Sequence, residues 1–221
     1  MPDVLEEFKK YLEFLPSLGF KEVYLSFQAK EVFAKMRSKK ELLEEIRQKL
    51  GDCKRCKLYQ TRHHIVFGEG NPEAKLVLVG EAPGREEDLQ GRPFVGAAGQ
   101  LLTKMLKAIG LSREEVYICN VIKCRPPGNR NPQPDEIEAC LPFLLEQLKV
   151  INPKVICTLG SISTRTLLNT NTPISRLRGQ VHQWHSIKLV PTFHPAYLLR
   201  NPAQKRLAWE DLQLIKKVIE E

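Results

Sequence analysis

The feature that most constrains the fold is a regular alternation of apolar runs and helix-patterned segments from Ala74 onward. Four runs rich in β-branched residues, KLVLVG, VYICNVI, KVICTLG and KLVPTFHP, are each followed by a segment with helical apolar spacing. Repeated strand-then-helix units are typical of a parallel sheet with helices on both faces. We therefore predict an α/β fold, a three-layer α/β/α domain around a central four-stranded parallel sheet.

The amino-terminal part of the chain has a different pattern. VLEEFKKYLEFL and EVFAKMRSKKELLEEIRQKL both have helical spacing with mixed charge, and neither has an internal Gly or Pro. We predict a helical amino-terminal extension over residues 1–48 and one domain over residues 49–221. The extension either packs on the domain or binds a partner protein, such as a replication or repair factor.

Length and charge narrow the function classes. The 221 residues can bury a full core, and no apolar run approaches the roughly 20 residues that a membrane span needs. The amino terminus starts acidic and lacks an uncharged segment, unlike a secretory signal. We therefore expect a cytoplasmic monomer with no membrane partner. The net charge of +8 favours a nucleic-acid partner, although a Lys/Glu-rich thermophile surface explains it equally well.

Four of the six cysteines are spaced like metal ligands. Cys53 and Cys56 form a CxxC pair, Cys124 follows the second predicted strand, and Cys140 lies in the next predicted helix. Without a secretory signal, metal ligation is favoured over disulfides. The spacing alone fits zinc and an iron–sulfur cluster equally well. The other two cysteines lie inside predicted strands, where we expect them to be core residues: Cys119 and Cys157.

The loops after the strands carry the candidate site, because ligands bind at the carboxyl ends of parallel strands. The first loop, GEAPGREEDLQGRPFVGAAGQ, has the glycines of a phosphate cradle. Its acids, Glu81, Glu86, Glu87 and Asp88, would repel a phosphate. The second loop runs from Asn120 through KCRPPGNRNP, the third is GSIS, and the last is HPAYLLRNP.

In combination, these motifs resemble the family-four, thermostable, iron–sulfur uracil-DNA glycosylases. The resemblance covers roughly residues 50–220 and rests on GEAPG-x-x-E-D, GRPFVG, N-x-x-K-C-R-P-P-x-N-R, HPAYLLR and the cysteine spacing. It implies a DNA-repair enzyme that flips uracil out of single- or double-stranded DNA and hydrolyses its N-glycosidic bond. It also implies a 4Fe–4S cluster with a mainly structural role on Cys53, Cys56, Cys124 and Cys140.

The resemblance implies a uracil pocket made of Gly80, Glu81, Ala82, Phe94, Asn120 and His194. Phe94 offers a flat face for stacking, and the Asn120 amide can pair with O4 and N3–H of uracil while rejecting cytosine. His194 can bond to O2 as negative charge builds on the leaving base. Glu81 is the candidate to stabilise the oxocarbenium-like sugar and to orient or deprotonate water.

Further residues are expected to support the pocket or hold DNA. Glu87 and Asn129 match accessory positions of the family. Leu198 and Leu199 are a candidate apolar wedge for the space of the flipped nucleotide. The candidate phosphate contacts are Ser161, Arg200, Arg125, Lys123 and Arg130.

Two other function classes fit part of the pattern. One is a uracil-DNA binder that traps its target without turnover, but relatives of that kind carry a basic insertion after GRPFVG, where this chain continues directly with GAAGQLLTKML. The other is an iron–sulfur nucleic-acid-binding or polymerase-associated module. Multiple turnover on a uracil-containing strand separates the enzyme from both.

Overall fold

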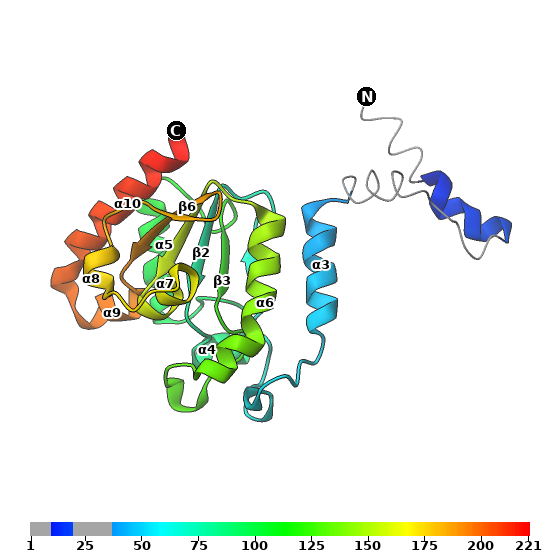
Figure 1. The fold of residues 1–221 in the computed structure, drawn as a ribbon, viewed down its shortest axis with the longest axis horizontal. Coiled ribbons are helices and arrows are strands. Elements are labelled where there is room, and N and C mark those ends of the chain that lie inside the picture. The colour runs from blue at the N-terminus through cyan, green and yellow to red at the C-terminus, as the bar shows by residue number, and fades with distance from the viewer. Residues whose placement is uncertain (1–9, 20–36) are drawn as a thin grey trace. The chain divides into compact units, whose positions relative to one another are not determined.

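The computed structural model describes residues 10–19 and 37–221 (Figure 1). The chain divides between Leu42 and Leu43 into two compact units. In the smaller unit, residues 10–14 are helical and continue into a 3-10 turn, η1 (Leu15–Leu18), which ends at Gly19 in the left-handed conformation. Residues 10–14 belong to the first predicted helix, VLEEFKKYLEFL. The rest of that predicted helix and residues 20–36 of the extension lie outside the described residues.

The second predicted helix is shorter than its sequence pattern. α3 (Lys39–Leu50) begins after Ser38, whose backbone N–H donates to Glu41 Oε2 at 2.8 Å while its Oγ accepts from the Glu41 N–H at 3.2 Å. This reciprocal pair is a capping box. The buried side chains of α3 belong to the core of the larger unit: Leu43, Ile46 and Leu50. The larger unit therefore starts before the predicted boundary at residue 48.

The sheet has six strands in the order β1-β3-β2-β4-β6-β5. They are β1 (Glu69–Gly70), β2 (Leu76–Gly80), β3 (Tyr117–Asn120), β4 (Val155–Leu159), β5 (His182–Trp184) and β6 (Ile187–Thr192). The four runs recognised in the sequence form the parallel centre, β3-β2-β4-β6, and β1 and β5 pair antiparallel at the edges. The prediction of a four-stranded parallel sheet therefore describes the centre of the sheet but omits the two edge strands, β1 and β5. Strands of two or three residues are too short to produce a detectable apolar alternation.

Helices cover both faces of the sheet, as predicted (Figure 1). On β2, Val77 and Val79 pack with α3 and α6 (Pro134–Ile151), whereas Leu76 and Leu78 pack with α5 (Ala97–Ala108) and α10 (Lys205–Glu220). The remaining helical elements are η2 (Lys57–Gln60), α4 (Arg85–Gln90), η3 (Pro127–Asn129), α7 (Ser161–Leu168), α8 (Ile174–Leu177), α9 (Pro195–Arg200) and η4 (Pro202–Gln204). In the described part of the chain, no helix is long and apolar enough to cross a membrane.

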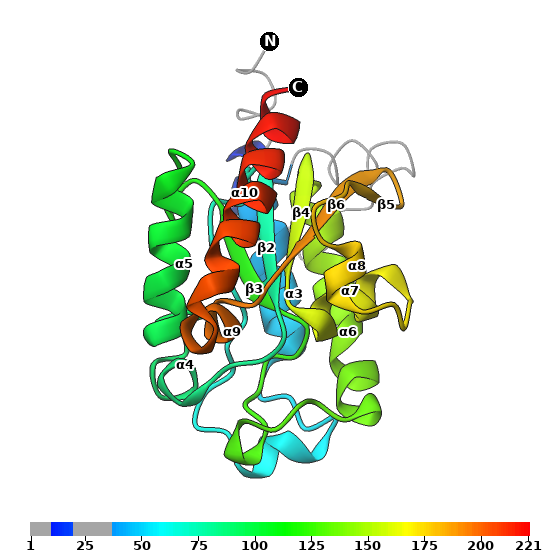
Figure 2. The ribbon, with the colours of Figure 1, turned by 90° about the vertical axis from the view of Figure 1, so that its left-hand side faces the viewer.

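The strand register gathers four loops at one end of the sheet. Gly80 at the end of β2 lies opposite Asn120 at the end of β3, and Leu159 of β4 lies opposite Thr192 of β6. The segments after these strands therefore emerge side by side. Figure 2 shows α4 and α9, which follow β2 and β6, near the same end.

A buried ion pair joins α10 to the end of α8, and a hydrogen bond to the same carboxylate joins α10 to β6, the strand that leads into the last of these loops. The Asp211 carboxylate is fully buried and accepts hydrogen bonds from Arg178 Nε at 3.0 Å, Arg178 Nη2 at 2.6 Å and Thr192 Oγ1 at 2.6 Å. Arg178 itself is only 12% exposed. Removing one partner of such a pair leaves the other charge buried and uncompensated.

We expect Asp211→Ala to lower the free energy of unfolding by about 3–5 kcal/mol, because Arg178 loses its compensating charge. Urea denaturation measures this difference. The neighbouring Glu210 is half-exposed and pairs with Arg206 at the surface, so Glu210→Ala should cost less than about 1 kcal/mol. Equal losses in the two variants would contradict the assignment.

Candidate active site

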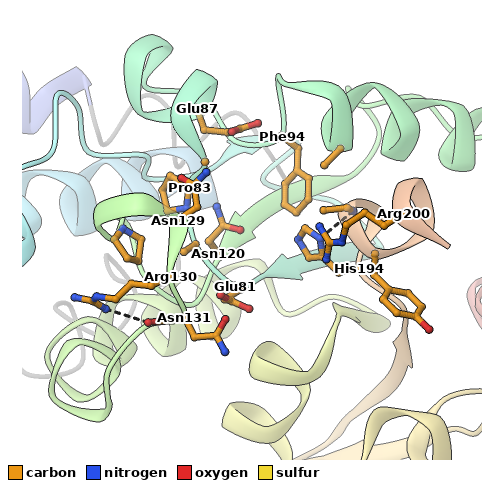
Figure 3. Close-up of a pocket in the computed structure, with 16 residues that line it drawn as sticks. Glu81, Pro83, Glu87, Phe94, Asn120, Asn129, Arg130, Asn131, His194 and Arg200 are labelled. Atoms are coloured by element: carbon orange, nitrogen blue, oxygen red, sulfur yellow. Dashed lines mark hydrogen bonds between the residues drawn. The ribbon is translucent and has the colours of Figure 1, made fainter.

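A cavity of about 360 Å3 opens at the carboxyl ends of the central strands (Figure 3). Its walls come from the loops after β2, β3 and β6, which is where the sequence predicted a site. The predicted residues that line it are Glu81, Ala82, Glu87, Phe94, Asn120, Asn129, Arg130, His194 and Arg200. Segments more than a hundred residues apart in the chain thus meet around one space.

Asn120 lies at the inner wall of this cavity. It ends β3 and is only 1% exposed. Among the described residues, its Oδ1 is the one buried side-chain nitrogen or oxygen without a hydrogen-bond partner. An unpaired buried acceptor is costly, so this atom is available to a ligand that donates an N–H.

The backbone of Gly80 packs against the Asn120 side chain, and Gly80 does not itself line the cavity. A Cβ at this position would collide with Asn120 Oδ1 and with the Phe94 ring. The backbone conformation of Gly80 is one that other residues also adopt. A glycine is needed here only because the two neighbouring side chains lie so close to the backbone. Any side chain at residue 80 would displace both neighbours.

Phe94 provides the flat apolar wall. Its side chain is largely buried, and its ring lies 5.6 Å from the His194 ring, tilted by 33° (Figure 3). The residue has a φ of 52°, in the left-handed region that non-glycine residues seldom adopt. Glu87 holds the chain that follows, because its Oε1 accepts the backbone N–H groups of Val95 at 2.8 Å and Gly96 at 2.9 Å.

His194 is held as a neutral hydrogen-bond donor. Burial, helped by the nearby positive charge of Arg200 and opposed by the charge of Glu87, lowers its pKa to about 4. Its Nδ1 accepts the Ala196 backbone N–H at 3.1 Å, at the start of α9. A neutral imidazole whose Nδ1 is an acceptor carries its proton on Nε2. Nε2–H is therefore the group that His194 can offer to a ligand.

Glu81 follows β2 directly and faces the same cavity (Figure 3). Burial raises the pKa of its carboxyl group above the ordinary value of 4.5. Within residues 10–19 and 37–221, no side chain or backbone group donates a hydrogen bond to this carboxylate. An unpaired, partly buried carboxylate can accept a proton from water or stabilise a nearby positive charge.

A second cavity of about 640 Å3 adjoins the first. Four residues line both: Glu81, Asn131, His194 and Tyr197. Ser161, at the start of α7, lines the second cavity but not the first. Asn131 and Tyr197 were not among the site residues predicted from the sequence. Tyr197 lies within the HPAY motif and could have been included, whereas nothing in the pattern around Asn131 distinguishes it from a turn residue.

The structure corrects two of the predicted DNA contacts. Leu198 is only 1% exposed and packs in the core with α5 and α10, so it is not a wedge; Leu199 is 43% exposed. Lys123 is fully buried, and its Nζ donates to Asn120 O at 2.9 Å and to Gln147 Oε1 at 2.6 Å, so it does not reach a phosphate.

The other predicted basic residues remain near the surface. Arg125 donates from Nε to Asn129 Oδ1 at 2.7 Å, which orients that accessory side chain. Arg130 forms two hydrogen bonds with the Glu136 carboxylate, at 2.6 and 2.8 Å. Arg200 lines the cavity at the end of α9.

The four cysteines with metal-ligand spacing line one small cavity: Cys53, Cys56, Cys124 and Cys140. Three of their sulfurs have nitrogen donors, namely Arg55 Nη1 to Cys53 at 3.4 Å, Arg62 Nη1 to Cys124 at 3.6 Å and the Lys123 backbone N–H to Cys140 at 3.2 Å. Among the described residues, no three His, Cys, Asp or Glu side chains are arranged to hold a single metal ion. Cys119 and Cys157 are buried in β3 and β4, as expected.

Comparison with known proteins identifies the family. The profile of the uracil DNA glycosylase superfamily matches residues 67–213. A type-4 uracil-DNA glycosylase from Thermotoga maritima is 46% identical over 188 residues, which cover 83% of this chain and 98% of the relative. The type-4 enzymes from Sulfurisphaera tokodaii and Archaeoglobus fulgidus are 47% and 48% identical, over 80% and 73% of this chain and 84% and 85% of theirs. The chain belongs to the uracil DNA glycosylase superfamily.

Proposed function

We propose that this protein is a DNA-repair hydrolase that removes uracil from DNA and leaves an abasic site. The observation that carries the proposal is the unpartnered Oδ1 of buried Asn120, which faces a cavity walled by Phe94 and His194. The type-4 uracil-DNA glycosylases are similar over most of the chain, which supports the same reaction class. Uracil arises in DNA when cytosine is deaminated, so this activity starts base excision repair.

Base selection depends on Asn120. Its Oδ1 accepts the N3–H of a flipped uracil, and its amide nitrogen donates to O4. Cytosine presents an acceptor at N3 and an amino donor at C4, so it would leave both Asn120 groups unpaired in a buried site. Cytosine is rejected strongly, because burying polar groups without hydrogen-bond partners costs much free energy. Phe94 provides the stacking face for the base.

Bond cleavage depends on charge that develops as the base leaves. The C1′–N1 bond breaks, its electron pair moves onto uracil, and the sugar acquires oxocarbenium character. The Nε2–H of neutral His194 donates to uracil O2, where part of that negative charge collects. Because this bond strengthens as the charge grows, it stabilises the transition state more than the ground state.

Glu81 acts on the sugar side of the cavity. Its carboxylate stabilises the positive charge on the sugar and orients the water that attacks C1′. The water contributes its hydroxyl group to C1′, and its proton passes to the carboxylate or to solvent. Arg200 and Ser161 contact flanking phosphates, and the exposed Leu199 fills the space that the flipped nucleotide leaves.

The cysteine cavity fits an iron–sulfur cluster. The four cysteines line one cavity, and three of their sulfurs have N–H donors of the kind that cluster ligands commonly accept. When bound, a 4Fe–4S cluster would link these four sulfurs covalently. Cys53, Cys56, Cys124 and Cys140 would hold it, and together they tie the segment before β1 to the loop that follows Asn120.

Uracil release from an oligonucleotide tests the function directly. We expect multiple turnovers with substrate in excess, and no release from the matched cytosine strand. Asn120→Ala should lower kcat/KM by about 100-fold or more, because the base loses its buried hydrogen bonds. Glu86→Ala is the control, because Glu86 is exposed on α4 and does not line the cavity. Absence of abasic product, or equal losses in the two variants, would overturn the assignment.

The pH dependence should report the ionisation of Glu81. The carboxylate is the active form, and burial raises its pKa above 4.5, so excision should fall as the pH is lowered through that raised pKa. Glu81→Gln should lower the rate by about 100-fold or more and remove this acid limb. Rates measured across a pH series check both effects. An acid limb that persists unchanged in Glu81→Gln would mean that another group controls it.

The cluster assignment predicts a spectroscopic difference between cysteines. The purified protein should absorb broadly near about 400 nm, and Cys56→Ala should lose this band together with part of its iron. Cys157→Ala is the matched control, because Cys157 is buried in β4 and does not line the cysteine cavity. A colourless protein that contains zinc by elemental analysis would contradict the cluster.

A further inference from the structure

The conformation of Phe94 requires external support. A φ of 52° is unfavourable for a residue with a Cβ, and the preceding residue is Pro93. Such a conformation persists only where the surroundings hold the chain firmly. The groups that hold it therefore determine where the Phe94 ring lies.

Arg113 binds two backbone carbonyl groups next to the Phe94 ring, one on each side of the Phe94 Cα atom. It lies in the segment between α5 and β3, and its side chain is only 17% exposed. Its Nη1 donates to Phe94 O at 2.9 Å, and its Nη2 donates to Pro93 O at 2.8 Å. One planar guanidinium group thus binds two successive carbonyl groups, which a single ammonium group does less well.

Glu69 orients Arg113. It lies on the edge strand β1, and its Oε1 accepts from Arg113 Nη2 at 2.6 Å. Its Oε2 accepts from Arg92 Nε at 2.8 Å. Burial alone would raise the pKa of Glu69, but the hydrogen bonds from Arg92 and Arg113 lower it, so the carboxylate is charged at neutral pH.

The carboxyl-terminal side of the ring is held independently. Glu87 accepts the N–H groups of Val95 and Gly96, and Gly99 of α5 lies so close that a Cβ there would collide with the Phe94 backbone. Four backbone groups of residues 93–96 are therefore bound to charged side chains: the carbonyls of Pro93 and Phe94 and the N–H groups of Val95 and Gly96. Two of these bonds, on the Pro93 and Phe94 carbonyls, come from Arg113 alone.

We propose that Arg113, oriented by Glu69, is a positioning residue that sets the Phe94 ring for uracil stacking. Arg113 does not line the cavity, so it acts through Phe94 and does not touch the base. The proposal rests on the proposed function, because it assigns Phe94 the stacking role. Arg113 is bonded to Glu69 of β1 and lies outside the GEAPG, GRPFVG, cysteine and HPAYLLR motifs.

A double-mutant cycle tests this route. Single-turnover excision is measured below the melting temperature for wild type, Arg113→Ala, Phe94→Ala and the double variant. We expect Arg113→Ala to slow excision by about 10-fold or more, since small displacements of positioning groups cost much in rate. In the Phe94→Ala background the same change should cost no more than about two-fold, because the ring it positions is absent. Equal losses in both backgrounds would overturn the proposal.

Arg92→Ala is the matched control. It also removes one arginine from Glu69, but Arg92 is 60% exposed and has no hydrogen bond to the Pro93 or Phe94 carbonyl among the described residues. We expect Arg92→Ala to change the excision rate by less than about two-fold, and Arg113→Lys to restore part of the rate. A drop in melting temperature without a slower rate in Arg113→Ala would show a merely structural role.

Hydrogen exchange tests the same positioning without relying on activity. In Arg113→Ala, the backbone amides of Phe94, Val95 and Gly96 should exchange faster while the central strands remain protected. Arg92→Ala should leave them unchanged. If the wild-type protein fails to release uracil, the proposed function fails, and the exchange result still decides whether Arg113 holds the loop. Unchanged exchange in Arg113→Ala would overturn the positioning role.

Discussion

The parallel pairing of β2 with β3 is the constraint on which the site depends. It places Gly80 opposite Asn120, and the ladder continues beyond the strands, with Val121 N–H bonded to Gly80 O at 3.0 Å and Ile122 N–H to Glu81 O at 3.1 Å. Because residue 80 has no side chain, the Asn120 amide and the Phe94 ring both fit against its backbone. The same register sends Glu81 into the cavity immediately after the strand. A shift of one residue would turn every side chain of β2 to the opposite face.

A buried polar network connects this register to the cysteine cavity. Lys123 Nζ donates to Asn120 O and Gln147 Oε1, and the Lys123 backbone N–H donates to Cys140 Sγ. Gln147 in turn donates to Phe67 O at 3.0 Å and to Tyr117 Oη at 3.1 Å. Burial lowers the pKa of the Lys123 amine, and a buried polar group of this kind needs hydrogen-bond partners. Two hydrogen bonds, both made by Lys123, therefore join Asn120 to Cys140, a proposed cluster ligand. This connection is a structural reason for the proposed cluster in an enzyme whose reaction transfers no electrons.

The sequence was sufficient for the parts of the structure that depend on local pattern. The central strands were predictable because fully buried strands are continuous apolar runs, and the loops after them could be placed at one edge of the sheet. Leu198 and Leu199 could not be distinguished, because both are leucines and only the turn of α9 decides which one faces the core. Lys123 was mistaken for a surface charge because its partners come from β3 and α6. Arg113 was missed because Glu69, the residue whose carboxylate it binds, lies 44 positions earlier in the chain, on a strand of two residues.

Burial disfavours the charged form of both catalytic candidates, because it lowers the pKa of His194 and raises the pKa of Glu81. It favours the neutral form of His194 and so removes the proton that would otherwise place a full positive charge beside the base. The same exclusion of water makes the Glu81 carboxylate less stable as an anion. Before cleavage, the cavity therefore holds an uncharged donor and a poorly solvated anion. In the proposed reaction, uracil becomes negative at the donor and the sugar becomes positive near the anion as the C1′–N1 bond lengthens, so both interactions improve together. An arrangement that improves only as charge separates lowers the barrier without tightening the binding of intact DNA.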